Sequence, residues 1–326
     1  MTVPGRAFFR GHGFPMDIPL HCAITGFRMN MDTAEAYAAC SALAKSHYEN
    51  FPVGRLVPAR LRPHVHAIYA FARVADDIAD EGYADPRLPV ADGTVLSQEQ
   101  RLQQMRSYRE ELRTWLSGQN PDSPYAWIFL PLRQTAQAFQ LPESLFYDLL
   151  SAFEQDIVKR RYETHAEVLD YCRRSANPIG RLVLLLHGYR QPELHALSDD
   201  ICTALQLANF WQDVSVDLVK DRIYLPVEDQ RTFGIDEKLL FDGRASEAFR
   251  ACLKFQVDRT QELFDHGRSL SRSLDFKLAW EIRLTWLGGA TILKKIRRQN
   301  YDTLTRRPKL TFADALTLVP RSLLSL

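Results

Sequence analysis

Cysteine is scarce in this chain and follows no pattern that would stabilise a fold. The 326 residues include five cysteines, an odd number, which are widely spaced and form no Cys-x-x-Cys pair. A disulfide framework and a structural zinc site both require cysteines in closer, paired spacing. The sequence therefore excludes a small disulfide-stapled scaffold and favours a protein of the reducing cytoplasm.

Long apolar runs and an excess of charge of one sign are also lacking. No uninterrupted apolar segment approaches the roughly 18 residues that cross a bilayer. The first residues are broken by Pro4, His12 and Pro15 before a signal-type core forms. With 41 Lys and Arg against 40 Asp and Glu, the net charge is +1, which gives no general attraction to nucleic acid. We expect a soluble cytoplasmic protein, at most peripheral to the inner membrane, with no nucleic-acid partner.

The sequence does contain a helical pattern over most of its length. From Thr33 onward apolar residues recur at intervals of three and four, and alternating strand patterns are nearly absent. We therefore predict an all-α fold, with a single domain over residues 32–326 and a poorly ordered extension over residues 1–31. The helical stretches are 34–46, 64–81, 98–116, 126–139, 143–160 and 246–301.

Two breaks interrupt this pattern. Asn177-Pro178 predicts either a corner between two helices or a kinked helix that lines a cavity, because proline frees a carbonyl one turn earlier. Gly288-Gly289 lies inside the expected helix 246–301, where each glycine costs about 1 kcal/mol relative to alanine. Close approach of another helix is the default reason for such a pair, and close approach of a ligand is the alternative.

An acidic group stands on one of the predicted helices. In Arg73-Val-Ala-Asp76-Asp77-Ile-Ala-Asp80, Asp76 and Asp80 lie one turn apart on the same face, and Arg73 lies a turn earlier. An acidic helical face is usually a solvated surface, but the apolar residues around this one leave the helix little polar surface. Carboxylates on a mostly buried helix need compensating cations.

A second group repeats this design about 130 residues later. Asn209, Asp213 and Asp217 recur at four-residue spacing and share one helix face. Their oxygen ligands suit Mg²⁺ rather than zinc. Two such helices facing a cavity would hold several Mg²⁺ ions and a diphosphate, whose departure leaves a carbocation that apolar walls would shelter. Arg73, Arg222 and the turn 297–301 could hold the leaving diphosphate.

These residues resemble a known family, the squalene and phytoene synthases, over about residues 40–305. The segment Ile68-Tyr-Ala-Phe-Ala-Arg-Val-Ala-Asp-Asp-Ile-Ala-Asp80 is similar to the first aspartate-rich signature. Leu205-Gln-Leu-Ala-Asn209, the aspartates after it and Arg222-Ile-Tyr-Leu-Pro226 are similar to the second. Tyr171-Cys172 and the residues up to Gly180 are similar to the family's segment at the interior break.

The resemblance implies an all-α isoprenoid synthase fold with a central apolar cavity. It implies metal ligands at Asp76, Asp80, Asn209, Asp213 and Asp217, with Asp77 as the middle acid of the first motif. It also implies contacts with the isoprenoid diphosphate substrate at Tyr69, Arg73, Gln206, Asn209, Arg222 and Arg297. The implied cofactor is Mg²⁺, as several ions bridged by diphosphate.

Three departures from the family pattern bear on the reaction. The chain has His47-Tyr-Glu-Asn50-Phe where a Ser-x-Ser-Phe element is typical, Gln212 where an arginine is expected, and Glu154 where a tyrosine is common. These features are more similar to the bacterial hydroxysqualene synthase branch of hopanoid biosynthesis. That branch implies ionisation of presqualene diphosphate, rearrangement and capture by water, without NADPH. His47, Asn50 and Glu154 then become candidate substrate-side residues. The water could be positioned by Tyr48, Glu49, Asn50 or Glu154.

Alternatives stay open at this point. A squalene or phytoene synthase that condenses two prenyl diphosphates head to head would show much the same motifs, and a non-catalytic assembly factor could share the fold. The basic tail Arg306-Arg-Pro-Lys309 and the amphipathic stretch after it could contact a membrane surface, or could dock against the protein's own core.

Overall fold

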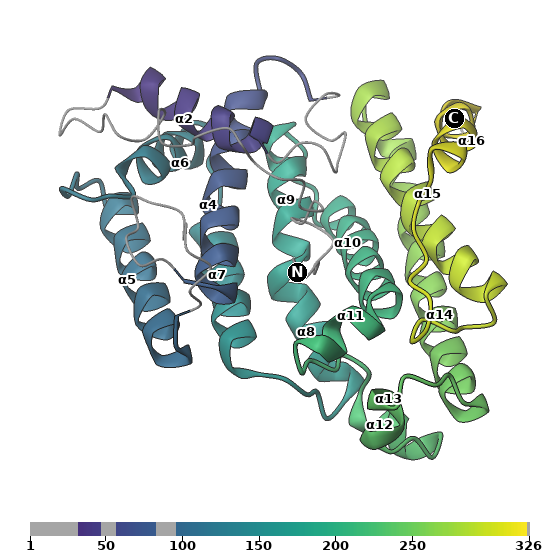
Figure 1. Ribbon diagram of the computed structural model, residues 1–326. Coiled ribbons are helices and arrows are strands. Elements are labelled where there is room, and N and C mark those ends of the chain that lie inside the picture. The colour runs from purple at the N-terminus through teal and green to yellow at the C-terminus, as the bar shows by residue number, and fades with distance from the viewer. Residues whose placement is uncertain (1–31, 47–56, 83–95, 325–326) are drawn as a thin grey trace. The chain divides into compact units, whose positions relative to one another are not determined.

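The structure is a computed structural model, and it describes residues 32–46, 57–82 and 96–324 (Figure 1). Every regular element in these ranges is a helix, so the all-α prediction is confirmed. The predicted extension over residues 1–31 lies outside the described residues. The helices fall into two compact groups, each described separately here, and a single domain stays a prediction.

The first group comprises residues up to Lys159 and the segment Leu182–Gly188. Its centre is α4, which packs against the other four helices of the group. The side chains of Phe71, Tyr108, Phe129 and Phe146 are fully buried and in ring contact at its core. The helices are α2 (Thr33–Ser46), α4 (Arg62–Asp80), α5 (Gln98–Leu116), α6 (Ala126–Phe139) and α7 (Glu143–Val158).

Local chemistry explains where these helices begin and how they tolerate breaks. Ser97 and Gln100 form a capping box, in which each side chain accepts from the other's backbone amide at the start of α5. Pro131 lies inside α6 and leaves the Trp127 carbonyl without its helical donor. The Cys40 thiol donates to that carbonyl over 3.3 Å, so the kink site also joins α2 to α6.

The second group comprises Arg160–Arg181 and the chain from Tyr189 onward. Its centre is α10, which packs along α14 and α15 (Figure 1). Side-chain oxygens of Thr164, Ser246 and Asp275 cap the starts of three of its helices. Its long helices are α8 (His165–Ser175), α10 (Pro192–Gln212), α14 (Glu247–Gly267), α15 (Phe276–Arg298) and α16 (Phe312–Leu324), and its short ones are α11 (Val214–Val219), α12 (Val227–Thr232), α13 (Glu237–Phe241) and the 3₁₀ helix η2 (Arg268–Ser273).

The prediction of one helix over 246–301 is wrong. The chain forms α14, then η2, and then starts α15 afresh, with the Asp275 carboxylate accepting from the backbone amides of Lys277 and Leu278. At the break, a Cβ on Gly267 would lie 2.6 Å from Ile201 Cγ1 and 3.0 Å from the Leu197 carbonyl oxygen. The α10 helix therefore packs closely against the end of α14. The extended residue before α15 is Leu274, and apolar spacing alone does not reveal it.

The break at Asn177-Pro178 is a single turn residue. The α8 helix ends at Ser175, Ala176 caps it, and α9 (Asn177–Leu186) resumes at once and belongs to both groups. The Thr203 hydroxyl donates to the Asn177 side-chain oxygen over 2.9 Å, which anchors the start of α9 to α10. Both interpretations, a corner between two helices and a kinked helix that lines a cavity, stay predictions.

The paired glycines of α15 have different surroundings. A Cβ on Gly289 would lie 2.5 Å from Phe264 on α14 and 2.7 Å from Leu205 on α10. A Cβ on Gly288 would meet only Leu310, at an ordinary 3.7 Å. Close approach of neighbouring helices, the default explanation, is confirmed for Gly289.

Candidate functional site

The first aspartate motif occupies the one incompletely buried stripe of α4. Tyr69, Arg73, Asp77 and Asp80 are partly accessible, whereas the residues between them are buried against α2, α5, α6 and α7. Successive steps of four, four and three residues keep this stripe on one side of the helix. The polar groups therefore line the side of α4 that the first group leaves uncovered.

Arg73 supplies the cation that these carboxylates need. Its guanidinium pairs with Asp77, with Nε 3.1 Å from Asp77 Oδ2, and Nη1 lies 3.8 Å from Asp76 Oδ2. Asp76 is only 3% exposed, so its charge lies in a poorly solvated place. The stripe is thus a partly neutralised acidic surface that still carries more carboxylates than cations.

Arg101 is a further residue that holds this motif in place, and sequence reasoning missed it. This arginine is buried on α5, and its Nη1 donates to the Ala79 and Asp80 carbonyl oxygens at the carboxyl end of α4. A cation at a helix C-terminus satisfies orphan carbonyls and complements the helix dipole. The available signal was an arginine within the apolar face of helix 98–116.

The second aspartate motif lies where α10 ends. Asn209, Asp213 and Asp217 are all buried, and Asp213 is 1% exposed. The backbone amides of Asp213 and Asp217 each donate to the carbonyl four residues earlier over 2.9 Å. Asn209 Nδ2 also donates to Asp213 Oδ2 over 3.1 Å. The helical path therefore continues across the α10–α11 junction and keeps the three side chains on one side.

An aromatic layer supports this end of α10. Phe210 stacks on Tyr224 with ring centres 3.7 Å apart and planes at 5°. Tyr162 and Tyr171 extend the cluster. Arg222 lies two residues before Tyr224 and is buried, and its backbone amide donates to the Asp217 carbonyl over 2.9 Å. The Arg222-to-Pro226 segment of the second signature thus fixes the backbone that carries Asp217.

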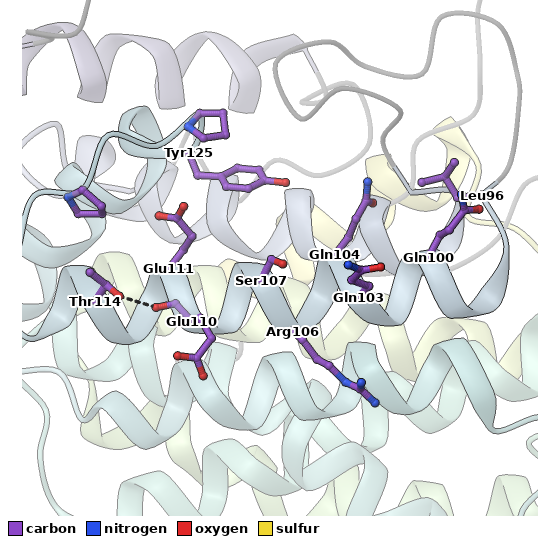
Figure 2. A pocket seen from close by; sticks show the side chains of 12 residues that line it. Leu96, Gln100, Gln103, Gln104, Arg106, Ser107, Glu110, Glu111, Thr114 and Tyr125 are labelled. Carbon is purple, nitrogen blue, oxygen red and sulfur yellow. Dashed lines mark hydrogen bonds between the residues drawn. The ribbon is translucent and has the colours of Figure 1, made fainter.

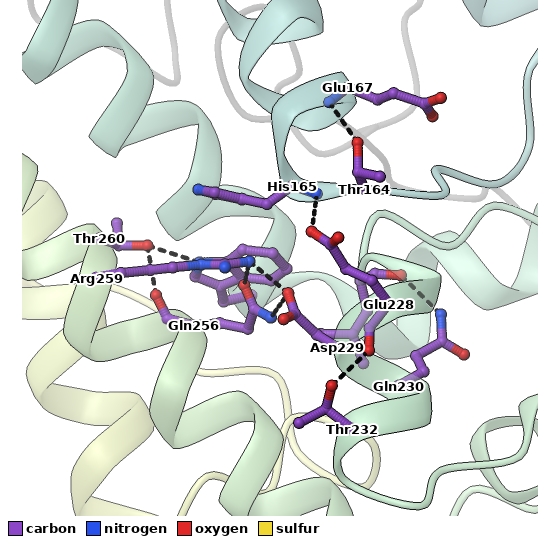
Figure 3. A network of polar contacts seen from close by, with 12 residues as sticks. Thr164, His165, Glu167, Glu228, Asp229, Gln230, Thr232, Gln256, Arg259 and Thr260 are labelled. Carbon is purple, nitrogen blue, oxygen red and sulfur yellow. Dashed lines mark hydrogen bonds and ion pairs between the residues drawn. The ribbon is translucent and has the colours of Figure 1, made fainter.

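A polar network anchors the other side of α10 (Figure 3). Trp211 Nε1 donates to the Thr260 hydroxyl over 2.8 Å, and Asp229 on α12 accepts from Gln256 and Arg259 of α14 over 2.8 and 2.7 Å. Burial and the nearby Arg259 charge lower the pKa of His165 to about 4, so this imidazole is neutral at neutral pH. The network fixes α10 against α14 and carries no feature of a reacting centre.

The C-terminal tail contacts the second motif directly. Arg307 forks onto Asp213, its Nε donating to Oδ1 and its Nη2 to Oδ2, the latter over 3.0 Å. Gln212 Nε2 donates to the Pro308 carbonyl over 2.7 Å, and Lys295 pairs with Asp314 at 2.6 Å. For this stretch, docking against the protein's own core is the interpretation that fits, and Gln212 has a defined partner where the family pattern expects an arginine.

The remaining predicted residues are placed as follows. Gln206 is buried on α10, one turn before Asn209. Arg297 donates to Asp258 and Gln261 of α14, each over 3.2 Å, so it joins two helices of the second group. Glu154 on α7 accepts from Arg109 of α5 over 2.9 Å. His47 and Asn50 lie outside the described residues.

A broad groove of 840 Å³ runs along α5 in the first group (Figure 2). Gln100, Gln104 and Glu111 are among the polar side chains that line it, and neither aspartate motif contributes to it. The groove is therefore not the apolar cavity that the sequence predicts, and that cavity stays a prediction.

A frame whose described elements are all helices, with aspartate motifs on α4 and on α10–α11, is the arrangement of the isoprenoid synthase class. A family model described as squalene/phytoene synthase matches residues 43–314. The chain therefore belongs to the squalene/phytoene synthase family and is an enzyme of that family.

Similar proteins include two hydroxysqualene synthases. The one from Zymomonas mobilis subsp. mobilis is 32% identical over 268 residues, which are 80% of this chain and 84% of that protein. The one from Rhodopseudomonas palustris is 32% identical over 262 residues, or 79% and 82% of the two chains. A solved squalene synthase, HpnC from Alicyclobacillus acidocaldarius, is 40% identical, has a TM-score of 0.73, and covers 82% of this chain and 95% of its own.

The donor set fits Mg²⁺. Carboxylate and amide oxygens are the hard ligands that this ion takes, and it commonly binds through one or two carboxylates plus substrate phosphates. Within the described ranges no three Asp, Glu, His or Cys side chains converge closely enough to hold an ion alone. Each motif instead presents a pair of acids one helical turn apart, which suits ions shared with a diphosphate. Arg307 forms an ion pair with Asp213. A cation bound at Asp213 would have to share this carboxylate with Arg307 or displace Arg307 from it.

Proposed function

We propose that this chain converts presqualene diphosphate to hydroxysqualene, with Mg²⁺ and without NADPH. The observation that carries the proposal is the presence of two acidic motifs that include buried aspartates, Asp76 to Asp80 on α4 and Asn209 to Asp217 on α10–α11. Support for this branch comes from the similarity to two hydroxysqualene synthases.

In this proposal, Asp76, Asp80, Asn209, Asp213 and Asp217 hold the ions. Mg²⁺ supplies positive charge to the diphosphate, which lets the carbon–oxygen bond break with its electron pair leaving on the diphosphate. Arg73 and Arg222 are the nearby cations suited to oriented, charge-assisted hydrogen bonds with the leaving group. Tyr69 lies two turns before Asp76 and Gln206 one turn before Asn209, and in this proposal both contact the substrate.

Water capture completes the proposed reaction. The rearranged cation accepts a water oxygen and the water loses a proton, so an alcohol forms and no hydride donor is needed. Glu154 is the described candidate for positioning this water, because its carboxylate is already oriented by Arg109 over 2.9 Å. A carboxylate that is already oriented can accept a hydrogen bond from the water without a further loss of side-chain conformational entropy.

Product analysis tests the proposal. Purified protein is incubated with presqualene diphosphate and Mg²⁺ in the absence of NADPH, and the extract is examined by mass spectrometry. We expect a C30 alcohol that is absent when EDTA is added. Survival of presqualene diphosphate, or release of squalene only when NADPH is supplied, would remove this function.

A squalene or phytoene synthase is the second candidate. It is favoured by the 40% identity to a protein described as a squalene synthase. The same preparation offered farnesyl or geranylgeranyl diphosphate would then form presqualene diphosphate or a condensed C30 or C40 hydrocarbon. Two-substrate condensation and water capture are thus separated by which diphosphate is consumed.

We also infer that α16 contacts a membrane surface, from which an apolar substrate would be drawn. No described helix is long and apolar enough to cross a membrane. Phe312, Leu316, Val319 and Leu323 are nonetheless exposed along one side of α16, with Phe312 80% accessible.

Replacing Phe312 and Leu316 with serine should lower binding to lipid vesicles about tenfold or more, because each buries apolar area in the interface. Thr317→Ser, also exposed, is the matched control, and equal vesicle flotation of all three proteins would contradict the inference.

A further inference from the structure

The second helix group contains a small pocket that neither aspartate motif touches. Its volume is 140 Å³, and it lies among α10, η2, α15 and α16. Of the described side chains that line it, none is acidic and four are arginines: Arg268, Arg272, Arg283 and Arg321. Ile201 is the residue of α10 that lines this pocket. It lies about 18 Å from Asp213 along the helix axis. The pocket is therefore separate from the proposed metal site.

Arg283 is the residue that most needs a partner in this pocket. It is 6% exposed, its Nε donates to the Ala279 carbonyl over 3.2 Å, and its buried Nη2 makes no hydrogen bond within the described part of the chain. Burial lowers the pKa of this guanidinium, which reflects the cost of holding its charge away from water. Native proteins rarely leave such a buried donor unpaired.

No carboxylate of α15 can reach Arg283 from within the helix. Glu281 is also buried and lies only two positions away, but residues at this spacing point to different sides of a helix. Glu281 accordingly forms no hydrogen bond or ion pair with Arg283 in the structure. The buried Nη2 of Arg283 thus has a hydrogen bond to donate to an anion in the pocket.

The pocket is also preorganised. Trp286 Nε1 donates to the Phe264 carbonyl over 2.7 Å, which fixes the indole ring in the pocket wall. The Arg268 guanidinium lies over that ring at 5.4 Å, so its position is held by a cation–π contact. Arg272 is exposed at the same wall and adds charge where a ligand would enter.

Size and chemistry select the ligand. The pocket's volume of 140 Å³ has room for one tetrahedral phosphate group. Guanidinium groups bind phosphate oxygens through paired, charge-assisted hydrogen bonds. We propose that this pocket binds a phosphate group, with Arg283 as its buried anchor.

Two sources could supply that group, free phosphate or diphosphate in solution and the headgroup of an anionic phospholipid. Isothermal titration of the full chain with inorganic phosphate and with diphosphate, without Mg²⁺, measures the first. Flotation with phosphatidylglycerol vesicles against phosphatidylcholine vesicles measures the second. Binding in either arm supports the pocket and identifies its source, provided that it depends on the arginines.

The variants are Arg283→Met and, since the buried change could impair folding, the exposed Arg272→Gln. We expect each to weaken phosphate or anionic-vesicle binding by about tenfold or more, the effect of losing a charge-assisted hydrogen bond. Arg298→Gln removes an exposed charge at the far end of α15 and should leave binding unchanged. Asp213→Asn should also leave it unchanged, which keeps the result independent of the proposed catalytic function. Absence of binding in both arms, or binding that survives Arg272→Gln and a folded Arg283→Met, would overturn the proposal.

Discussion

Replacing Asp213 with asparagine should lower turnover of the isoprenoid diphosphate by at least about a thousandfold. Asp213 is 1% exposed, central in the second motif, and hydrogen-bonded to Asn209. Asparagine keeps the size of the side chain but removes the charge that would bind Mg²⁺. The measurement is the rate of diphosphate release across a Mg²⁺ titration, with presqualene diphosphate as substrate.

The matched control is Asp221→Asn. Asp221 lies four residues after Asp217, is exposed, and has a φ of 56°, a backbone conformation that asparagine adopts readily. This change should alter turnover by less than about twofold, which falls within the usual range for surface substitutions. Near-normal turnover of Asp213→Asn at saturating Mg²⁺ would show that Asp213 is not a metal ligand.

Arg307→Gln separates the ion pair from the metal site. Both Asp213→Asn and Arg307→Gln break the same pair, so both should lose about 1–3 kcal/mol of stability. Their effects on Mg²⁺ binding should be opposite, because Arg307 competes with the cation for Asp213. Thermal unfolding with Mg²⁺ and diphosphate added measures both quantities in one experiment.

The helical frame and both acidic motifs could be predicted from the sequence because they depend on local spacing. Apolar residues at intervals of three and four marked α4 and α10, and the four-residue spacing of Asn209, Asp213 and Asp217 placed them on one side of the chain. These patterns hold whatever packs around them, since they follow from the helical repeat alone.

Contacts between distant segments could not be predicted in this way. Arg307 meets Asp213 from 94 residues away, and Arg101 reaches the end of α4 from the next helix. For the basic tail, membrane contact and docking against the core both stayed open, because nothing in the local sequence identifies Asp213 as the partner of Arg307. The break between α14 and α15 was missed because the spacing of apolar residues does not reveal the extended conformation of Leu274.

The second large effect is expected at Glu281, as a dependence of stability on pH. Glu281 is 6% exposed on α15, and burial raises its pKa from 4.5 to about 8. Between these two values the folded chain keeps a proton that the unfolded chain has lost, so folding is favoured less as pH rises. At about 1.4 kcal/mol for each pKa unit, the loss between pH 4.5 and pH 8 is on the order of 4 kcal/mol.

Glu281→Gln removes this titration while keeping the shape of the side chain. The variant should melt at the same temperature as the parent near pH 4.5, and about 5–10 °C higher at pH 8, where the parent must hold either a buried charge or a bound proton. Glu262→Gln, an exposed change on α14, should follow the parent at both values. Because every other titrating group is shared by the three proteins, the difference between their melting curves isolates Glu281. Parallel curves for Glu281→Gln and the parent from pH 4.5 to 8 would mean that this carboxyl finds a partner or water in solution and ionises normally.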